Sequence, residues 1–355
     1  IIDKEFDKID LSSIPAQLIN KLSFIRCSFK KIIFPENFEC DYDLYDEGSK
    51  YYHVYFPTIK PDLWYNFQER RLGESSITFR RNLYLELGRF CNAKCQFCRN
   101  QYLDTCTYSL ETIKENLMKI SRGIDSVVIG GGEPTLLLND LNILVDYCKW
   151  GISNWTIFTN ASLSLDDLLK LSRDYKLNIS RHSVNDDINN KIFGVNTLST
   201  SELLNLSENS RRTITLCPTC FKGAGVDTVE KIEDYIQFAY DCNIKNILFQ
   251  TLHKDLDNNC DMKVLPIEDE IFDEIIKKLE EQGFDIGVPI YSTGDYKLII
   301  AKKDDKIISF KKYITEEELQ REWYQASKRT FDLSMDPSGN IYQNWHQSSG
   351  KVLIK

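Results

Sequence analysis

Apolar side chains in this sequence follow two alternating spacings. Short runs rich in Val, Ile, Leu and Phe have the length and composition of strands, and most lead into a longer segment with apolar residues at helical spacing. The predicted strands are residues 82–87, 126–129, 155–158, 177–180, 213–216 and 246–252. The predicted helical segments are residues 109–122, 137–150, 164–175, part of 187–210, 228–242 and 268–282.

Strand and helix alternate along the whole of this central region. Such a succession indicates a parallel sheet with helices on its outer side, because parallel neighbours need a crossover connection. We therefore expect an α/β fold, an open partial (β/α)6 barrel rather than a closed eight-fold one. In folds of this kind the chemistry lies on the loops that follow the strands.

The two flanks of the chain have different patterns. Residues 1–80 are dense in Phe and Tyr without strand–helix alternation, and we expect an appended N-terminal segment that recognises a substrate or caps the barrel. The barrel itself is assigned to residues 81–285, and residues 286–355 are expected to form a β-rich C-terminal extension. Two β-hairpins are predicted in this extension, residues 297–302 with 306–310 and residues 331–335 with 340–345.

Three cysteines follow the first predicted strand directly. Cys91, Cys95 and Cys98 lie on one short loop and can all point inward. Thiolates hold iron–sulfur clusters, and three ligands to a four-iron cluster leave one iron open to a further ligand. The alternative is a zinc site, although zinc sites commonly pair two CxxC units or end in closely spaced histidines. The chain has only 4 His, so the spacing favours the iron–sulfur cluster.

A glycine-rich motif follows the second predicted strand. It consists of Gly131, Gly132, Glu133 and Pro134, and its glycines permit close approach of the backbone to a ligand. Together with the CxxxCxxC pattern, in this order and one βα unit apart, the motif resembles the signature of the radical S-adenosylmethionine (SAM) superfamily. The resemblance extends over about residues 82–255 and is greatest to the branch of the molybdopterin-precursor cyclase and peptide-modifying enzymes.

The resemblance implies the cofactors and their contacts. A 4Fe-4S cluster would be bound by the three cysteines, and the glycine-rich motif would contact the amino group of SAM. Reductive cleavage of SAM would give a 5′-deoxyadenosyl radical that abstracts hydrogen from a substrate. Further SAM contacts are expected from polar residues at later strand ends, namely Thr159, Asn160, Ser180, Arg181 and Gln250. No general acid or base is assigned.

The same resemblance implies two kinds of partner. The mechanism needs an external one-electron donor such as a flavodoxin or ferredoxin. The substrate is expected to be a peptide or protein, and the alternative is a small molecule or nucleotide. A reading from another class, a zinc-binding barrel scaffold without catalysis, is opposed by the intact cysteines and Glu133.

Further cysteines and two histidines remain open at this point. Cys217, Cys220, Cys242 and Cys260 either hold an auxiliary cluster or are buried thiols, and the second reading is favoured. His182 and His253 each follow a predicted strand, so they either meet the substrate or are structural loop residues.

Charge and hydropathy exclude two classes of partner. A net charge of −9 argues against electrostatic binding of nucleic acid, which depends on clustered Lys and Arg. No apolar run approaches the length of about 18 residues that a membrane span needs. The first residues lack the basic and apolar regions of a secretory signal, so we expect a cytoplasmic protein.

Overall fold

The computed structural model describes most of the chain from residue 78 onward. The described residues are 78–98, 107–120, 124–148, 152, 154–163, 165–171, 175–223, 226–252, 264–292, 296–315, 318, 321, 328–342 and 352–354, with six short strands before residue 56. These strands are β1 (Glu5–Phe6), β2 (Ile9–Asp10), β3 (Ser28–Phe29), β4 (Ile32–Ile33), β5 (Asp43–Leu44) and β6 (Val54–Tyr55). His253, Cys260 and nearly all of segment 1–80 lie outside the described residues.

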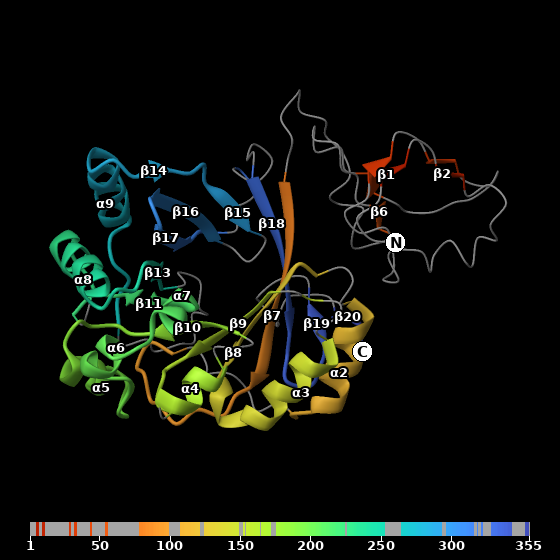
Figure 1. The fold of residues 1–355 in the computed structure, drawn as a ribbon, viewed down its shortest axis with the longest axis horizontal. Coiled ribbons are helices and arrows are strands. Elements are labelled where there is room, and N and C mark those ends of the chain that lie inside the picture. The colour runs from red at the N-terminus through yellow and green to blue at the C-terminus, as the bar shows by residue number, and fades with distance from the viewer. Residues whose placement is uncertain are drawn as a thin grey trace.

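The predicted strands form the centre of one curved sheet (Figure 1). They are β7 (Thr78–Gly88), β8 (Ser126–Gly131), β9 (Asn154–Thr159), β10 (Lys176–Ser180), β11 (Ile214–Cys217) and β13 (Asn246–Thr251). Each pairs in parallel with the next in this order. The predicted α/β partial barrel is therefore confirmed.

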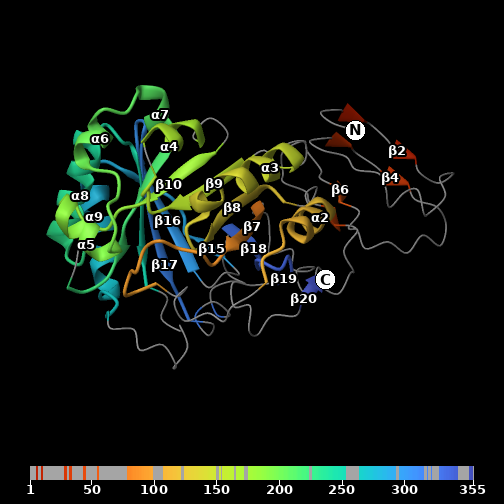
Figure 2. The same cartoon turned by 90° about the horizontal axis from the view of Figure 1, so that it is seen from below.

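Helices lie along the outer face of this sheet (Figure 2). They are α2 (Leu110–Ile120), α3 (Leu138–Cys148), α4 (Leu165–Leu171), α5 (Asp186–Phe193), α6 (Thr200–Leu204), α7 (Glu208–Arg212), α8 (Val229–Asp241) and α9 (Asp269–Glu281), with the 3-10 helix η5 (Pro134–Leu137). The segment 187–210 holds parts of three short helices where one was expected. Asn185, Ser199 and Ser207 each cap one of them by accepting a backbone N–H. In the described part of the chain, no helix is long and apolar enough to cross a membrane.

The C-terminal strands extend the same sheet from both of its edges. They are β14 (Asp285–Ile286), β15 (Ile290–Ser292), β16 (Tyr296–Lys303), β17 (Lys306–Tyr313), β18 (Lys328–Met335), β19 (Ile341–Tyr342) and β20 (Val352–Ile354). Within the central region, a further short strand, β12 (Thr219–Cys220), pairs with β13. Both predicted hairpins form, β16 with β17 and β18 with β19. In addition β17 pairs in parallel with β13, and β18 with β7. The short β15 pairs with both β16 and β18. The C-terminal strands therefore lie along the side that the six central strands leave open.

Side chains along each strand alternate between the apolar core under the helices and the concave side of the sheet. On β7, Leu83, Leu85 and Leu87 are fully buried in the apolar core that the helices cover. The residues between them face the other way, and Asn82 and Tyr84 line a cavity on the concave side. A period of two on a strand produces this division, and it leaves the concave side available for ligand contacts.

Candidate functional site

A cavity of about 540 Å³ lies on the concave side of the sheet, in the size range of ligand pockets. Its walls come from the ends of the central strands and from the C-terminal strands. All three residues of the cysteine motif line it. Of the predicted SAM contacts, it is lined by Gly131, Gly132, Glu133, Thr159, Asn160, Ser180 and Gln250.

The cysteine loop follows β7 and turns tightly between its last two thiols. The Cys98 backbone N–H donates to the Cys95 carbonyl at 3.0 Å. Cys95 is buried and Cys91 is exposed. Burial raises the pKa of the Cys95 thiol to about 12, and the nearby Cys98 and Cys91 add to the rise. The Cys95 thiol is therefore protonated at neutral pH, and binding a metal there requires that it lose this proton.

The donor set fits an iron–sulfur cluster better than it fits a closed zinc site. Three thiols share one loop and one cavity, and the described residues that line this cavity include a single histidine, His182. Among the described residues, no three Cys, His, Asp or Glu side chains already stand in a metal-binding arrangement. The fit rests on the chemistry and shared placement of the donors.

Contacts from two neighbouring elements hold the cysteine loop. Asn92 donates through Nδ2 to Ser162 Oγ at 2.8 Å and accepts from Asn160 Nδ2 at 2.9 Å. The Lys94 backbone N–H donates to the Phe193 carbonyl at 2.8 Å, at the C-terminus of α5. The loop is therefore fixed to the ends of β9 and α5 through residues that lie between the cysteines.

The glycine-rich motif packs directly on the start of the cysteine loop. The N–H groups of Gly132 and Glu133 donate to the carbonyls of Gly88 and Phe90, both at 2.7 Å. A Cβ at Gly132 would lie 1.9 Å from the Phe90 oxygen, and Gly131 has a φ of +109°. From the sequence we expected the glycines to let a ligand approach the backbone. The two backbone segments already lie so close together that neither glycine has room for a side chain.

Glu133 is a buried junction between strands. Its Oε1 accepts from Thr159 Oγ1 at 2.8 Å and from the backbone N–H and hydroxyl of Thr135 at 3.1 and 2.5 Å, while Oε2 accepts from the Asn160 N–H at 2.7 Å. Burial raises the pKa of this carboxyl, and the four donors act against that rise. Pro134 is buried and begins η5, which Glu133 caps. Both residues thus have structural roles beside the one the resemblance implies.

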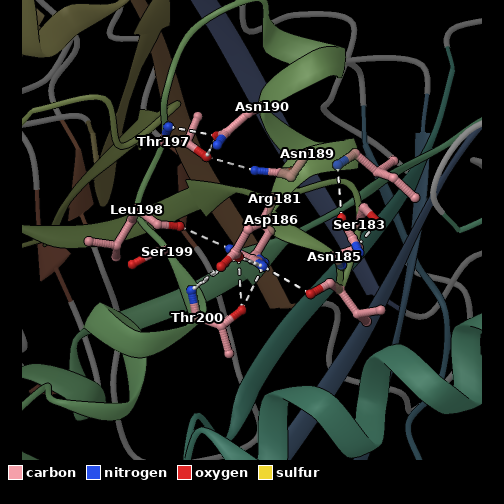
Figure 3. A network of polar contacts seen from close by, with 12 residues as sticks. Arg181, Ser183, Asn185, Asp186, Asn189, Asn190, Thr197, Leu198, Ser199 and Thr200 are labelled. Atoms are coloured by element: carbon pink, nitrogen blue, oxygen red, sulfur yellow. Dashed lines mark hydrogen bonds and ion pairs between the residues drawn. The ribbon is translucent and has the colours of Figure 1, made fainter.

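Arg181, another predicted SAM contact, makes its contacts within the fold (Figure 3). Its guanidinium donates to the carbonyls of Leu198 and Val184 and pairs with Asp186 at 2.5 Å. The side chain is 2% exposed and does not line the cavity. Arg181 therefore holds the turns around α5 and α6 together, and its guanidinium is paired with Asp186 there.

Comparison with known proteins agrees with this geometry. Residues 85–239 match the family model described as the radical SAM superfamily. Residues 85–239 form a radical SAM domain. A "Probable GTP 3′,8-cyclase" of Saccharolobus solfataricus is 34% identical over 122 residues, which cover 32% of this chain and 39% of that protein. The chain thus spans about two fifths of the length of such relatives.

Solved structures show the same fold over more of the chain. SuiB of Streptococcus suis bound to S-adenosylmethionine aligns with a TM-score of 0.54 at 16% identity, covering 77% of this chain and 63% of that one. SuiB bound to the precursor peptide SuiA aligns with a TM-score of 0.51 at 17% identity, covering 74% of this chain and 59% of that one. At these identities the likeness concerns the fold.

Cys217, Cys220 and Cys242 are core residues. Cys217 and Cys220 are fully buried, and Cys242 is 1% exposed. Burial raises the pKa of both Cys217 and Cys220 far above the ordinary thiol range. None of the three lines the cavity, which supports the reading as buried thiols.

The cavity also contains residues that sequence reasoning did not select. From the C-terminal strands, Lys311 enters with Nζ 4.1 and 4.8 Å from the ring centroids of Tyr296 and Tyr313. Asp332 enters from β18 and accepts from Asn82 Nδ2 at 2.7 Å. No local motif marks these residues, because only the pairing of distant strands brings them to the cavity of the radical SAM domain.

Proposed function

We propose that the protein is a radical SAM enzyme that cleaves SAM reductively at a cluster bound by Cys91, Cys95 and Cys98. The observation that carries this proposal is the placement of three thiols on one loop that lines the cavity at the strand ends. The matched domain, whose family uses a 4Fe-4S cluster and SAM, supports it.

The cluster would supply one electron to bound SAM, giving methionine and a 5′-deoxyadenosyl radical that takes hydrogen from the substrate. The chain contributes position and enclosure. The contacts of Asn92 and Lys94 hold the loop still, and Glu133 fixes the glycine-rich turn against it. The strands on the open side place Tyr296 and Tyr313 in the lining of the cavity.

The substrate is proposed to be a peptide or protein. The fold is shared with SuiB, which has been solved with a precursor peptide. In addition, the C-terminal strands contribute a wall of the cavity that a side chain of the peptide could contact. The second candidate is a nucleotide, favoured by the sequence match to GTP 3′,8-cyclases. A flavodoxin or ferredoxin is proposed as the electron donor.

Iron, acid-labile sulfide and 5′-deoxyadenosine, measured per chain after anaerobic reconstitution, test the central proposal. We expect about four irons and dithionite-dependent 5′-deoxyadenosine in the parent, and neither in a Cys91/Cys95/Cys98→Ala variant. Zinc without iron in the parent would contradict the proposal and indicate a zinc-binding barrel without catalysis. Iron without SAM cleavage would also contradict it.

The substrate class is tested by the rate of 5′-deoxyadenosine formation with GTP and with a pooled peptide library. Stimulation by peptides alone supports the leading candidate, and transfer of deuterium from a labelled peptide into 5′-deoxyadenosine identifies the hydrogen donor. Stimulation by GTP alone would assign the protein to the second candidate.

A further inference from the structure

A second cavity lies against the cysteine loop. Its volume is about 710 Å³, and it is bordered by the loop, by α5, by the start of α8 and by the segment that follows β12 (Figure 1). The loop contributes Lys94, Gln96 and Phe97, which stand between the thiols in the chain. The thiols themselves line the first cavity and not this one. The cysteine loop is therefore accessible from two sides.

One aromatic ring is shared by the two cavities. Phe97 lines both of them. Its ring centroid lies 4.8 Å from that of Phe221, which lines the second cavity, and 4.9 Å from that of His182, which lines the first. A group seated in the second cavity is thus separated from the space around the thiols by a single layer of side chains.

Lysines gather around the second cavity, although the chain as a whole is acidic. Lys94, Lys191, Lys222 and Lys231 line it together with one carboxylate, Asp234. All four lysines are exposed, and they stand in a chain with a net charge of −9. The cavity therefore presents a local positive surface toward solvent.

Ion pairs within the chain offset only part of this charge. Lys222 pairs with Glu268 and Lys231 pairs with Asp227, and the two lysine side chains are 45% and 50% exposed. Exposed pairs of this kind contribute little energy, so a carboxylate of a partner can compete for these lysines. In the described part of the chain, Lys191 has no ion-pair partner.

Apolar side chains lie among the lysines. Val184 and Ile188, at the start of α5, are 39% and 46% exposed and line the second cavity with Phe97 and Phe221. An apolar centre with a charged rim is the usual composition of a protein interface. The charge of this rim favours an acidic partner over a basic one.

We propose that the second cavity is the docking surface of an acidic flavodoxin-type carrier that delivers the electron for SAM cleavage. The inference rests on the proposed function, since it needs a cluster at the three thiols. SAM and substrate would occupy the first cavity, and a partner at the second one reaches the loop without displacing either. The apolar centre suits the dimethylbenzene edge of a bound flavin, and the lysines suit the acidic surface around it.

The transfer moves one electron and no atom. The reduced flavin is oxidised by one electron, and the cluster is reduced by one. The lysines would act on the encounter of the two proteins, because opposite charges raise association rates by about 10- to 1,000-fold at low salt.

Reversal of two lysine charges tests the surface. Lys191→Glu combined with Lys222→Glu changes two exposed side chains outside the cysteine loop and the first cavity. Formation of 5′-deoxyadenosine driven by flavodoxin, kept reduced with NADPH and flavodoxin reductase, should fall about 10-fold or more. The rate driven by dithionite, which needs no docking, should stay within about twofold of the parent.

A second double variant has the same change in net charge at other positions. Lys176→Glu combined with Lys277→Glu alters two exposed lysines that do not line the second cavity. Both rates of this control should stay within about twofold of the parent.

Association with oxidised flavodoxin gives a readout that does not depend on turnover. Titration calorimetry at about 50 mM salt should show binding to the parent, weakened about 10-fold in Lys191→Glu/Lys222→Glu. At about 500 mM salt the difference between the two proteins should disappear, because the salt screens exposed charges.

The outcomes separate this inference from the proposed function. An unchanged flavodoxin-driven rate in the Lys191→Glu/Lys222→Glu variant overturns the inference, and so does an equal loss with dithionite. Loss of stimulation by the peptide library in that variant would assign the cavity to the substrate instead. A parent that uses dithionite or a ferredoxin but not flavodoxin overturns this inference alone. A parent without iron, or without 5′-deoxyadenosine under dithionite, overturns the proposed function as well.

Discussion

The Glu133 carboxylate accepts the backbone N–H of Asn160 at 2.7 Å and so joins the end of β8 to the end of β9. Because Glu133 also donates its own N–H to the Phe90 carbonyl, the same residue reaches the cysteine loop. Asn160 in turn donates through its side chain to Asn92 of that loop. Three successive strand ends are therefore coupled around the thiols through the side chains of Glu133, Asn160 and Asn92.

Replacing Glu133 by Gln tests this junction. The substitution puts an amide N–H₂ among four donors, so at least one buried donor loses its acceptor. We expect the free energy of unfolding to fall by about 1–3 kcal/mol, measured by urea denaturation. Glu115→Gln, at an exposed position of α2, is the matched control and should change stability by less than about 0.5 kcal/mol. Equal effects of the two would contradict a structural role for the carboxylate.

Replacing Gly132 by Ala tests the packing of the glycine-rich turn. The new Cβ would meet the Phe90 oxygen at 1.9 Å, so the start of the cysteine loop must move. We expect iron content after reconstitution to fall by more than half. Gly223→Ala is the control, because its φ of +88° imposes strain while nothing lies within 4 Å of the new Cβ. That variant should keep its iron, and full iron in Gly132→Ala would show that the loop tolerates the shift.

Replacing Cys95 by Ala tests the ligand assignment. Loss of one of three thiolates should abolish iron binding and SAM cleavage together. The double replacement of Cys217 and Cys220 removes two buried core thiols and should leave about four irons per chain. SAM cleavage by Cys95→Ala would refute the assignment, and a loss of about four irons from about eight in the double variant would establish an auxiliary cluster.

Replacing Arg181 by Lys tests whether this cation serves the fold or the cofactor. A lysine can still pair with Asp186 but cannot also reach the carbonyls of Leu198 and Val184 in the same geometry. We expect a loss of about 1–3 kcal/mol in unfolding free energy and unchanged SAM affinity. A large loss of affinity with unchanged stability would restore the predicted SAM contact.

The buried His182 predicts a specific dependence of stability on pH. Burial lowers its pKa in the folded state to about 3, whereas the unfolded chain takes up the proton near the ordinary value of 6.5. The unfolded state therefore binds more protons in this window, and stability is full above pH 6.5 and falls as the pH falls. The contribution is about 1.4 kcal/mol per pH unit. Urea denaturation of the parent and His182→Gln at several pH values should give a steeper slope for the parent. Parallel curves would exclude this origin.

The sequence by itself determined the features that rest on local order. The spacing of Cys91, Cys95 and Cys98, the glycine-rich motif one βα unit later and the six strand runs are each readable within a few tens of residues. The period of two on β7 also separates the helix-facing leucines from the residues that line the cavity. These features sufficed for the fold and the family.

The tertiary structure alone decided which distant groups meet. Asn82 and Asp332 are 250 positions apart and are joined only because β18 pairs with β7. Arg181 and His182 are neighbours at the end of one strand, yet one turns into the fold and the other to the cavity. Long-range pairing and the partner that each polar group finds depend on packing, and neither leaves a periodic signal in the chain.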